Sequence, residues 1–395
     1  MERKVSPYNE PLTPASPLLL CDVTLREGEQ TAGVSFTQEE RIGLVKRLEA
    51  ARFQQVQLYN TWHGTAVDEK ALEINAELCA LPRTYCKTEV LNFNTQNLEA
   101  LKKMIDLQAQ TKPDIIHASF SLADGPEEEL QEREHRIQLT ADYIASKNIK
   151  CNISLLDSTR SKPELLTRLT RAAAHAGAAR VRLADTVGVA EPDGIRIMCE
   201  TAMQAIGDTP TLLGIHTHND FGLGLADALA GIRGGARLID GSLNALGERC
   251  GNASLIEIVL ALEGLYGVPT GIDLTKLLDL AHYVEQISGI PLPANAPIVG
   301  KYAFSDSLGA HILLSAKKPF AVQGIRPETF GGHRLAFLSK NLTTDAIALL
   351  ARRQGYTVTP QQCETIYRAI CRETDGQKGV VLTEEDLPRF IKDTH

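Results

Sequence analysis

The sequence predicts an α/β fold: a (β/α)8 TIM barrel followed by a smaller, mainly helical C-terminal region. Eight short apolar runs alternate with longer amphipathic stretches after residue 17, and eight such units in about 250 residues are the repeat of a closed parallel barrel. Polar motifs follow nearly every apolar run, as they do where a barrel carries its active site at the strand ends. A doubly wound open sheet would show the same alternation, but the count of eight favours the barrel.

The elements can be assigned in chain order. Residues 1–17 contain four prolines and are expected to form an extended arm. Period-two and short apolar patterns predict strands at 18–23, 54–59, 84–91, 114–119, 150–155, 179–183, 211–216 and 238–243. Helical periodicity predicts helices at 38–51, 66–80, 98–108, 127–147, 162–176, 194–205, 224–234 and 254–265. Thr37 and Glu40 have the spacing of a capping box, which predicts the start of the first helix.

The alternation stops after Gly267, where prolines punctuate a connector with one helix at 274–288. Helical patterns return at 344–354 and 360–372. We therefore expect a catalytic barrel at 18–268 and a connector with a helical subdomain at 269–395.

Composition excludes several classes of partner. The chain has 395 residues, 43% hydrophobic and 23% charged, with a net charge of −8, which argues against nucleic acid or an anionic membrane as the main partner. No run of 18 apolar residues and no apolar leader occurs. The eight cysteines include no CxxC pair, as is usual for reduced thiols. We expect a cytoplasmic protein without a membrane segment.

Two motifs carry most of the predicted chemistry. The first, at 22–31, is DVTLREGEQT and ends an apolar run; the second, at 216–220, is HTHND and ends another. Histidines at i and i+2 of an extended segment point to the same side. A carboxylate and two imidazoles at strand ends can make half the shell of a divalent cation and leave positions open for substrate.

Each feature alone has a plainer interpretation. The two histidines could be a hydrogen-bonded pair, Arg26 and Glu27 a surface ion pair, Thr186 the cap of a turn, and Cys250 a small buried residue. Their occurrence together, at corresponding ends of successive strands, favours a metal-centred active site.

Four motifs resemble one family in their order and separations. DVTLREGEQ at 22–30, DTVG at 185–188, HTHND at 216–220 and GERCGN at 247–252 are similar to those of 2-isopropylmalate synthases and homocitrate synthases. These enzymes are grouped with HMG-CoA lyase among metal-dependent TIM-barrel enzymes. The resemblance implies a Claisen condensation of an acyl-CoA, usually acetyl-CoA, with a 2-oxo acid, in amino-acid biosynthesis.

The resemblance also implies roles for individual residues. It implies that a divalent metal (Mg, Mn or Zn) is held by Glu27, His216 and His218, with Asn252 near it. Arg26 would donate hydrogen bonds to the substrate oxygen, and Thr186 would contact a carboxylate. The residues implied to bind substrate are Arg26, Gln30, Gln57, Asn152, Ser154 and Thr186. Those implied in catalysis are Arg26, Tyr302, Asp306 and His311.

Three departures from the family pattern bear on the acceptor and on the base. Gln57 stands where the family has an acid, and Asn152 where homocitrate synthases have an arginine that grips a distal carboxylate. Leu156 also replaces an acid. These changes favour a 2-oxo acid with an apolar or uncharged tail over 2-oxoglutarate. Asp306 stands where the family has a histidine thought to help deprotonate the acyl-CoA, so Asp306, assisted by His311 or Tyr302, is the expected base.

Two other functions stay open at this point. The first is a metal-dependent aldolase or carbon–carbon lyase acting on a 2-oxo acid. The second is a catalytically silent relative kept as a binding or regulatory subunit, because two expected proton-transfer groups are replaced. By analogy with the family we expect a homodimer in which the C-terminal subdomain of one chain completes the partner's site.

Overall fold

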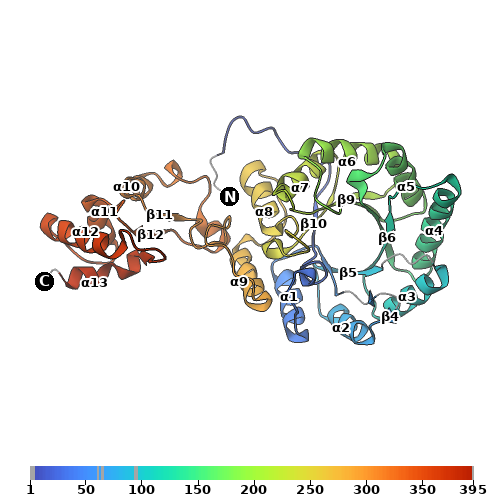
Figure 1. Ribbon diagram of the computed structural model, residues 1–395, viewed down its shortest axis with the longest axis horizontal. Helices are drawn as coiled ribbons and strands as arrows, with labels where there is room; N and C mark the ends of the chain where they lie inside the picture. Colours follow the sequence, from blue (N-terminus) through green and yellow to red (C-terminus); the bar gives the residue numbers. More distant parts are fainter. Residues whose placement is uncertain (1–4, 60–61, 64–65, 93–96, 394–395) are drawn as a thin grey trace. The chain divides into compact units, whose positions relative to one another are not determined.

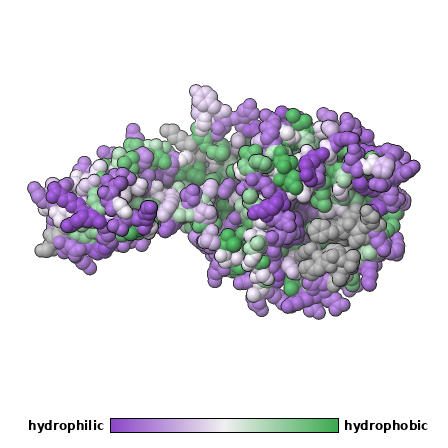
Figure 2. Space-filling model, viewed as in Figure 1, coloured by the Kyte–Doolittle hydropathy of each residue, from purple (hydrophilic) through white to green (hydrophobic). Residues whose placement is uncertain are grey.

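The computed structural model describes residues 5–59, 62–63, 66–92 and 97–393. The chain forms two compact units, one of Glu10–Pro291 and one of Leu292–His395 together with Met1–Asn9. No helix in the described ranges is long and apolar enough to cross a membrane. Hydrophilic residues predominate on the face shown in Figure 2, while the large apolar side chains are mostly buried in the cores of the units.

The first unit is a closed barrel of eight parallel strands (Figure 1). Around the barrel the order is β1-β10-β9-β8-β7-β6-β5-β2, and pairing of Leu19 with Leu238 closes it. The strands are β1 (Leu19–Asp22), β2 (Gln55–Gln57), β5 (Lys87–Asn92), β6 (Ile115–Ser121), β7 (Lys150–Leu156), β8 (Arg180–Asp185), β9 (Leu212–Thr217) and β10 (Leu238–Gly241). Each overlaps a predicted strand, so the predicted fold class is confirmed.

Helices between the strands surround the barrel (Figure 1). They are α1 (Gln38–Ala50), α2 (Glu69–Ala80), α3 (Leu98–Gln110), α4 (Glu127–Ser146), α5 (Pro163–His175), α6 (Pro192–Ile206), α7 (Gly224–Arg233) and α8 (Leu255–Leu260). A π-helical turn, Ala261–Tyr266, continues α8. The capping box before α1 is present, with Thr37 and Glu40 each bonding the other's backbone N–H. A two-stranded sheet of β3 (Trp62–His63) and β4 (Ala66–Val67) was not predicted.

Helix α9 (Leu277–Ser288) belongs to the barrel unit. The Tyr283 hydroxyl donates to the carbonyl of Glu40, 2.9 Å away, at the start of α1. The Asn244 side chain donates to the carbonyl of Ala281 at 2.8 Å. The compact units divide after residue 291, whereas the sequence placed the boundary after 268. The helix in the connector was predicted at 274–288, but its contacts with the barrel unit were not.

The second unit combines helices with a small sheet. Its helices are α10 (Gly309–Lys317), α11 (Thr344–Arg353), α12 (Pro360–Thr374) and α13 (Leu387–Lys392). The strands β11 (Ser305–Asp306), β12 (Leu335–Leu338) and β13 (Leu382–Thr383) form a three-stranded sheet. An apolar cluster that includes Ile347, Leu350 and Ile366 forms the core. The unit is mainly helical, as predicted, but its sheet was missed because strands of two to four residues are too short to show a period.

Candidate active site

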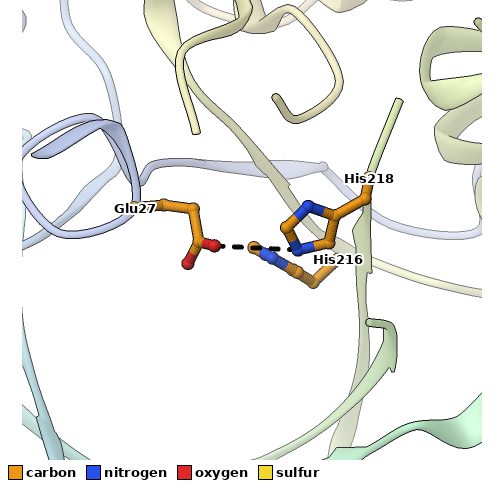
Figure 3. Close-up of side chains that lie close together, drawn as sticks. All are labelled: Glu27, His216 and His218. Atoms are coloured by element: carbon orange, nitrogen blue, oxygen red, sulfur yellow. Dashed lines mark ion pairs between the residues drawn. The ribbon is translucent and has the colours of Figure 1, made fainter. Parts of the chain in front are cut away.

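Glu27, His216 and His218 form a compact cluster of buried ligand groups at the end of the barrel (Figure 3). One candidate ligand atom from each lies within 4.8 Å of the others, and Glu27 Oε1 lies 3.7 Å from His218 Nε2. His216 belongs to β9, and Glu27 follows β1. The predicted metal ligands are thus brought together by strands that are far apart in the sequence.

The turn after β1 fixes the position of Glu27. Asp22 ends the strand, and its carboxylate accepts hydrogen bonds from the backbone N–H and the hydroxyl of Thr24 at 3.1 and 2.7 Å. The Glu27 N–H then donates to the carbonyl of Val23 at 2.7 Å. A Cβ at Gly28 would lie 3.3 Å from side-chain atoms of Thr24 and Leu246, so a larger residue at this turn would press on both side chains. Burial raises the pKa of Asp22 to about 7.

The surroundings of the two histidines fit them as metal ligands. His216 Nδ1 lies 3.0 Å from Asp240 Oδ2, which fixes the tautomer and leaves Nε2 for a cation. Burial lowers the pKa of both imidazoles, and it lowers that of His218 to about 3 with help from His216. Both are therefore neutral at physiological pH, the state in which imidazole binds a metal.

Asn252 lies beside His218 in the structure. Its backbone forms an antiparallel bridge with His218, and its side-chain amide donates to the carbonyl of Leu246 at 3.2 Å. Its Oδ1 is buried without a hydrogen-bond partner among the described residues. A buried oxygen without a partner is costly unless something binds it, and a divalent cation accepts this ligand type. The donor set of two imidazoles with oxygen ligands fits Mg, Mn or Zn.

A cavity of about 370 Å³ opens over the cluster. Its wall contains seven of the residues predicted to bind substrate or metal: Arg26, Glu27, Gln30, Ser154, Thr186, His216 and His218. The whole wall consists of Arg26, Glu27, Gln30, Leu91, His117, Ser119, Ser154, Leu156, Arg182, Ala184, Thr186, His216, His218 and Glu248. The wall thus combines small or apolar side chains, such as those of Ser119, Leu156 and Ala184, with the charged side chains of Arg26 and Glu27 after β1 and of Arg182 on β8.

Arg26 has the position and charge of an oxygen-binding group. It forms an ion pair with Glu27, and its Nε donates to Gln57 Oε1 at 2.9 Å. Burial lowers the pKa of Arg26 to about 10, so the guanidinium still carries its charge at neutral pH. Because Gln57 holds one end of the guanidinium, the rest of it can face the cavity.

Thr186 is the first residue of the loop that follows β8. Its hydroxyl oxygen accepts a hydrogen bond from the Asp157 N–H at 2.9 Å, and its carbonyl accepts one from Arg249 Nη2 at 2.9 Å. The hydroxyl proton is not used by either contact and can be donated to an anionic group in the cavity. This geometry suits the predicted contact with a substrate carboxylate.

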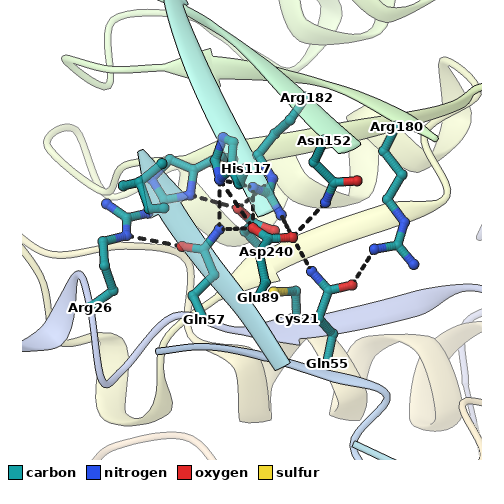
Figure 4. A network of polar contacts seen from close by, with 12 residues as sticks. Cys21, Arg26, Gln55, Gln57, Glu89, His117, Asn152, Arg180, Arg182 and Asp240 are labelled. Carbon is teal, nitrogen blue, oxygen red and sulfur yellow. Dashed lines mark hydrogen bonds and ion pairs between the residues drawn. The ribbon is translucent and has the colours of Figure 1, made fainter. Parts of the chain in front are cut away.

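A charged network lies in the barrel interior below the cavity (Figure 4). The buried carboxylate of Glu89 accepts hydrogen bonds from the amides of Gln55, Gln57 and Asn152. It also pairs with Arg182 Nη1 at 2.8 Å. Gln57 and Asn152 are thus engaged with Glu89, and neither is in the described wall of the cavity; the contact of both with substrate stays a prediction.

Arg182 joins two buried carboxylates. Its Nη1 pairs with Glu89, and its Nε lies 2.9 Å from Asp240 Oδ2, the group that orients His216. Burial alone would raise the pKa of Glu89, but Arg182 and His117 hold it well below its usual range. The pKa of Arg182 is in turn raised by Asp240 and Glu89, against the effect of burial. Glu89 and Arg182 therefore both carry their charges at physiological pH.

Glu89, His117, Arg182 and Asp240 were not predicted as site residues. The predicted residues follow or end strands for the most part, whereas these four lie within strands. A signal was available: Arg182 lies between Val181 and Leu183, and Asp240 follows the apolar pair Leu238 and Ile239. Charged residues within such runs are seldom buried without a partner.

The three residues predicted for proton transfer lie in the C-terminal unit. Asp306 Oδ2 accepts a hydrogen bond from Arg334 Nη1 at 2.9 Å, and Asp306 Oδ1 lies 4.0 Å from His311 Nδ1. Tyr302 is 39% exposed and packs edge-on against Phe337. Asp306 and His311 are thus neighbours, and the role of all three in proton transfer stays a prediction.

Comparison with known proteins settles the family. Residues 18–284 match the family model described as HMGL-like. The chain belongs to this family. It is 31% identical over 98% of its length to the proposed (R)-citramalate synthase CimA of Methanopyrus kandleri, covering 74% of that protein. It is 29% identical to the homocitrate synthase AksA of Methanocaldococcus jannaschii, over 99% of the chain and 94% of the relative.

Another relative supports the family, and a solved structure supports the fold. The 2-isopropylmalate synthase 2 of Caldanaerobacter subterraneus is 30% identical over 89% of each chain. The HMG-CoA lyase of Bacillus subtilis superposes with a TM-score of 0.58 at 22% identity, covering 72% of this chain and 97% of the lyase; this likeness supports the barrel fold alone. Because the relatives of this HMGL-like chain are named as synthases, it is an enzyme of the acyltransferase class, and enzymes of the family use a divalent metal.

Proposed function

We propose that this HMGL-like enzyme catalyses a divalent-metal-dependent Claisen condensation of acetyl-CoA with a 2-oxo acid whose tail is uncharged. The products are CoA and a dicarboxylic acid with a hydroxyl group at carbon 2. The observation that carries the proposal is the cluster of Glu27, His216 and His218, which opens into a cavity also lined by Arg26 and Thr186.

Each group in the cavity has a part in binding the acceptor. Glu27, His216, His218 and Asn252 would hold the cation. When bound, a divalent cation polarises the ketone and stabilises negative charge on its oxygen. Arg26 donates hydrogen bonds to the same oxygen, where charge develops. The Thr186 hydroxyl donates to the carboxylate of the acid, and Gln30 supports the loop at the cavity edge.

An uncharged tail is favoured by the charges around the cavity. The two arginines of its described wall are both ion-paired, Arg26 with Glu27 and Arg182 with Glu89 and Asp240. A second carboxylate would therefore have no guanidinium of its own to pair with. Leu91 and Leu156 add apolar surface to the same cavity.

The carbon–carbon bond requires a base for the methyl group of the thioester. We assign this step to Asp306, assisted by His311 or Tyr302. The base removes one methyl proton, the resulting carbanion attacks the ketone carbon, and the oxygen formed takes up a proton. Water then cleaves the thioester and releases CoA. A carboxylate can serve as this base if it reaches the methyl group.

The test is release of free thiol from acetyl-CoA by purified protein loaded with Mg, Mn or Zn. The acceptor panel runs from pyruvate and glyoxylate through 2-oxoisovalerate and phenylpyruvate to oxaloacetate and 2-oxoglutarate. We expect metal-dependent thiol release with an acid of uncharged tail. If no acid of the panel gives thiol release although the metal is bound stoichiometrically, the proposal is contradicted and aldol or lyase chemistry is favoured.

We further propose that the enzyme acts as a homodimer whose chains exchange the proton-transfer residues. Glu27→Ala and Asp306→Ala variants should each be inactive alone, and co-refolding should restore about a quarter of wild-type activity if the sites are mixed. Failure to complement, although each variant dimerises normally, would show that one chain supplies both groups.

A further inference from the structure

Arg249 lies in the loop between β10 and α8, and it is not part of the described wall of the cavity. Its guanidinium makes a bidentate pair with Asp220, with Nε 2.8 Å from Oδ1 and Nη2 2.9 Å from Oδ2. Nη2 also donates to the carbonyl of Thr186 at 2.9 Å, and Nη1 lies 3.3 Å from Glu248 Oε2. One side chain thus joins the loops that follow β8, β9 and β10.

Each of these three loops carries a group of the candidate active site. Thr186, after β8, is expected to contact the carboxylate of the acid. Asp220 follows His218 by two positions in the loop after β9, and Asn252 follows Arg249 by three in the loop after β10. Arg249 therefore connects the expected carboxylate contact with two of the expected metal ligands.

The backbone around Arg249 is shaped for this contact. Gly188 has a φ of +60°, and a Cβ there would lie 2.6 Å from Asp220 Oδ2 and 3.1 Å from the Asp220 nitrogen, so the two loops touch directly. Arg249 itself has a φ of +57°, which residues other than glycine seldom adopt. Such a conformation persists where surrounding contacts hold it, and here the pair with Asp220 does so.

The metal-binding loops have supports that do not involve the Arg249 side chain. His218 and Asn252 form a backbone bridge, and the Asn219 N–H donates to the carbonyl of Gly251 at 2.9 Å. The loop after β8 lacks such supports. Among the described residues, the bond from Arg249 to the Thr186 carbonyl is the only hydrogen bond from 186–191 to 218–223 or 242–254. Removal of Arg249 should therefore release Thr186 and leave the metal ligands in place.

We propose that Arg249 is a positioning residue that sets the place of Thr186 relative to the metal site, and thereby determines how tightly the enzyme binds the carboxylate of its 2-oxo acid. The inference rests on the proposed function, which supplies the binding mode of the acid. The ketone must meet the cation while the carboxylate meets the Thr186 hydroxyl, so the separation of these two groups decides the affinity.

The first experiment compares wild type with Arg249→Gly, both loaded with metal, in the thiol-release assay. Glycine adopts a positive φ without strain, so this variant removes the contact and relieves the backbone at once. We expect KM for the 2-oxo acid to rise by about 10- to 100-fold, with metal content and KM for acetyl-CoA unchanged. An unchanged KM for the acid would overturn the inference. A rise in KM for acetyl-CoA alone would also overturn it, since Arg249 would then bind the thioester.

The second experiment tests whether Arg249 acts through Thr186. Thr186→Val removes the hydroxyl, so the position of this residue no longer matters to the carboxylate. In the Thr186→Val background, Arg249→Gly should therefore change KM for the acid by less than about threefold, because coupled residues are not additive. If the full effect of Arg249→Gly persists in that background, Arg249 does not act through Thr186 and the inference is wrong.

A matched variant separates positioning from stability. Arg249→Lys keeps the charge beside Asp220, but an ammonium cannot reproduce the planar contact with both the carboxylate and the Thr186 carbonyl. We expect its melting temperature to equal that of wild type and its KM for the acid to be raised. A wild-type KM in the lysine variant would show that charge alone suffices. This comparison also decides the question if the glycine variant does not fold.

A binding measurement distinguishes failure of this inference from failure of the proposed function. Calorimetry follows the binding of pyruvate and 2-oxoisovalerate to metal-loaded wild type and Arg249→Gly without acetyl-CoA. Weaker binding to the variant, with no thiol release from either protein, would support the role of Arg249 and contradict the Claisen condensation. Thiol release by both proteins with equal KM for the acid would do the reverse.

Discussion

The interior of the barrel and the core of the C-terminal unit are equally buried but are built by opposite means. Below the active site, Glu89, Arg182 and Asp240 are fully or almost fully buried and joined by ion pairs. In the C-terminal unit, Ile347 and Leu350 are fully buried in an apolar cluster. Barrel interiors are usually filled by branched apolar side chains, so the polar interior here marks the strands that carry the site.

Because one interior is charged and the other apolar, the two regions should respond to different kinds of substitution. A polar network fixes its members by distance and direction, and removal of one partner leaves a buried charge uncompensated. An apolar core depends on volume, so it tolerates a change of shape that keeps the volume. We therefore expect the barrel interior to respond to charge and pH, and the C-terminal core to respond to cavities.

The largest expected effect is loss of the metal site. Glu27→Ala should lower kcat/KM by about 1,000-fold, because it removes a ligand of a cation that stabilises the developing charge. Metal content measured by elemental analysis should fall with the activity. Glu27→Asp, which keeps the carboxylate, is the matched control and should retain metal. Full activity in the alanine variant would show that Glu27 is not a ligand.

The second effect compares the two interiors directly. Glu89→Leu should destabilise the barrel by about 3–5 kcal/mol, because it leaves Arg182 without one of its two carboxylates. Leu350→Ala should destabilise the C-terminal unit by about 2–5 kcal/mol through a cavity. Urea unfolding measures both costs, and hydrogen exchange locates them, with faster exchange in β5–β8 for the first and in α11 and α12 for the second. A loss of less than about 1 kcal/mol for Glu89→Leu would mean that the network contributes little to the stability of the barrel.

The third effect is a pH dependence confined to the barrel. The pKa of His117 is lowered to about 4 in the folded state, against about 6.5 in an unfolded chain. As pH falls, the unfolded state takes up this proton first, so stability is lost between pH 6.5 and 4, by up to about 3 kcal/mol. His117→Gln should remove this part of the slope.

The measurement is the difference in unfolding free energy between wild type and His117→Gln across that range. Glu89 and Arg182 are present in both proteins, so their own contributions to the pH dependence largely cancel in the difference. Parallel curves would contradict the assignment. Leu350→Ala serves as the control, since it should shift the curve for the C-terminal unit without changing its slope.

The smallest effect tests a motif that both regions share. Thr37 and Thr359 cap α1 and α12 through capping boxes of the same kind. Thr37→Ala and Thr359→Ala should each cost about 1 kcal/mol, because each leaves helix N–H groups without a partner. Thermal unfolding measures the cost, and kcat should not change. If only one of the two variants loses stability, packing must replace the cap in the other region.

Much of the site could be predicted because its chemistry is local in sequence. Two histidines two residues apart on a strand must point the same way, and the turn after β1 places an arginine and a glutamate at a strand end. The structure brings Glu27, His216 and His218 within 4.8 Å, as predicted. No comparable pattern of neighbouring residues predicts the short strands β11 and β13 or the packing of α9 on the barrel.

The sequence by itself determined the eight-fold alternation, the family and the metal-binding residue types, because periodicity and motif spacing are properties of neighbouring residues. The tertiary structure alone decided which polar groups meet: Glu89 with Gln57 and Asn152, Arg182 with Asp240, and His117 with the cavity. Those contacts join residues that are 32 to 93 positions apart in the chain, and their partners follow only from strand order and from the alternation of side chains into the barrel. That is why the hydrogen bonds of Gln57 and Asn152 to Glu89, and the place of His117 in the cavity wall, were not predicted from the sequence.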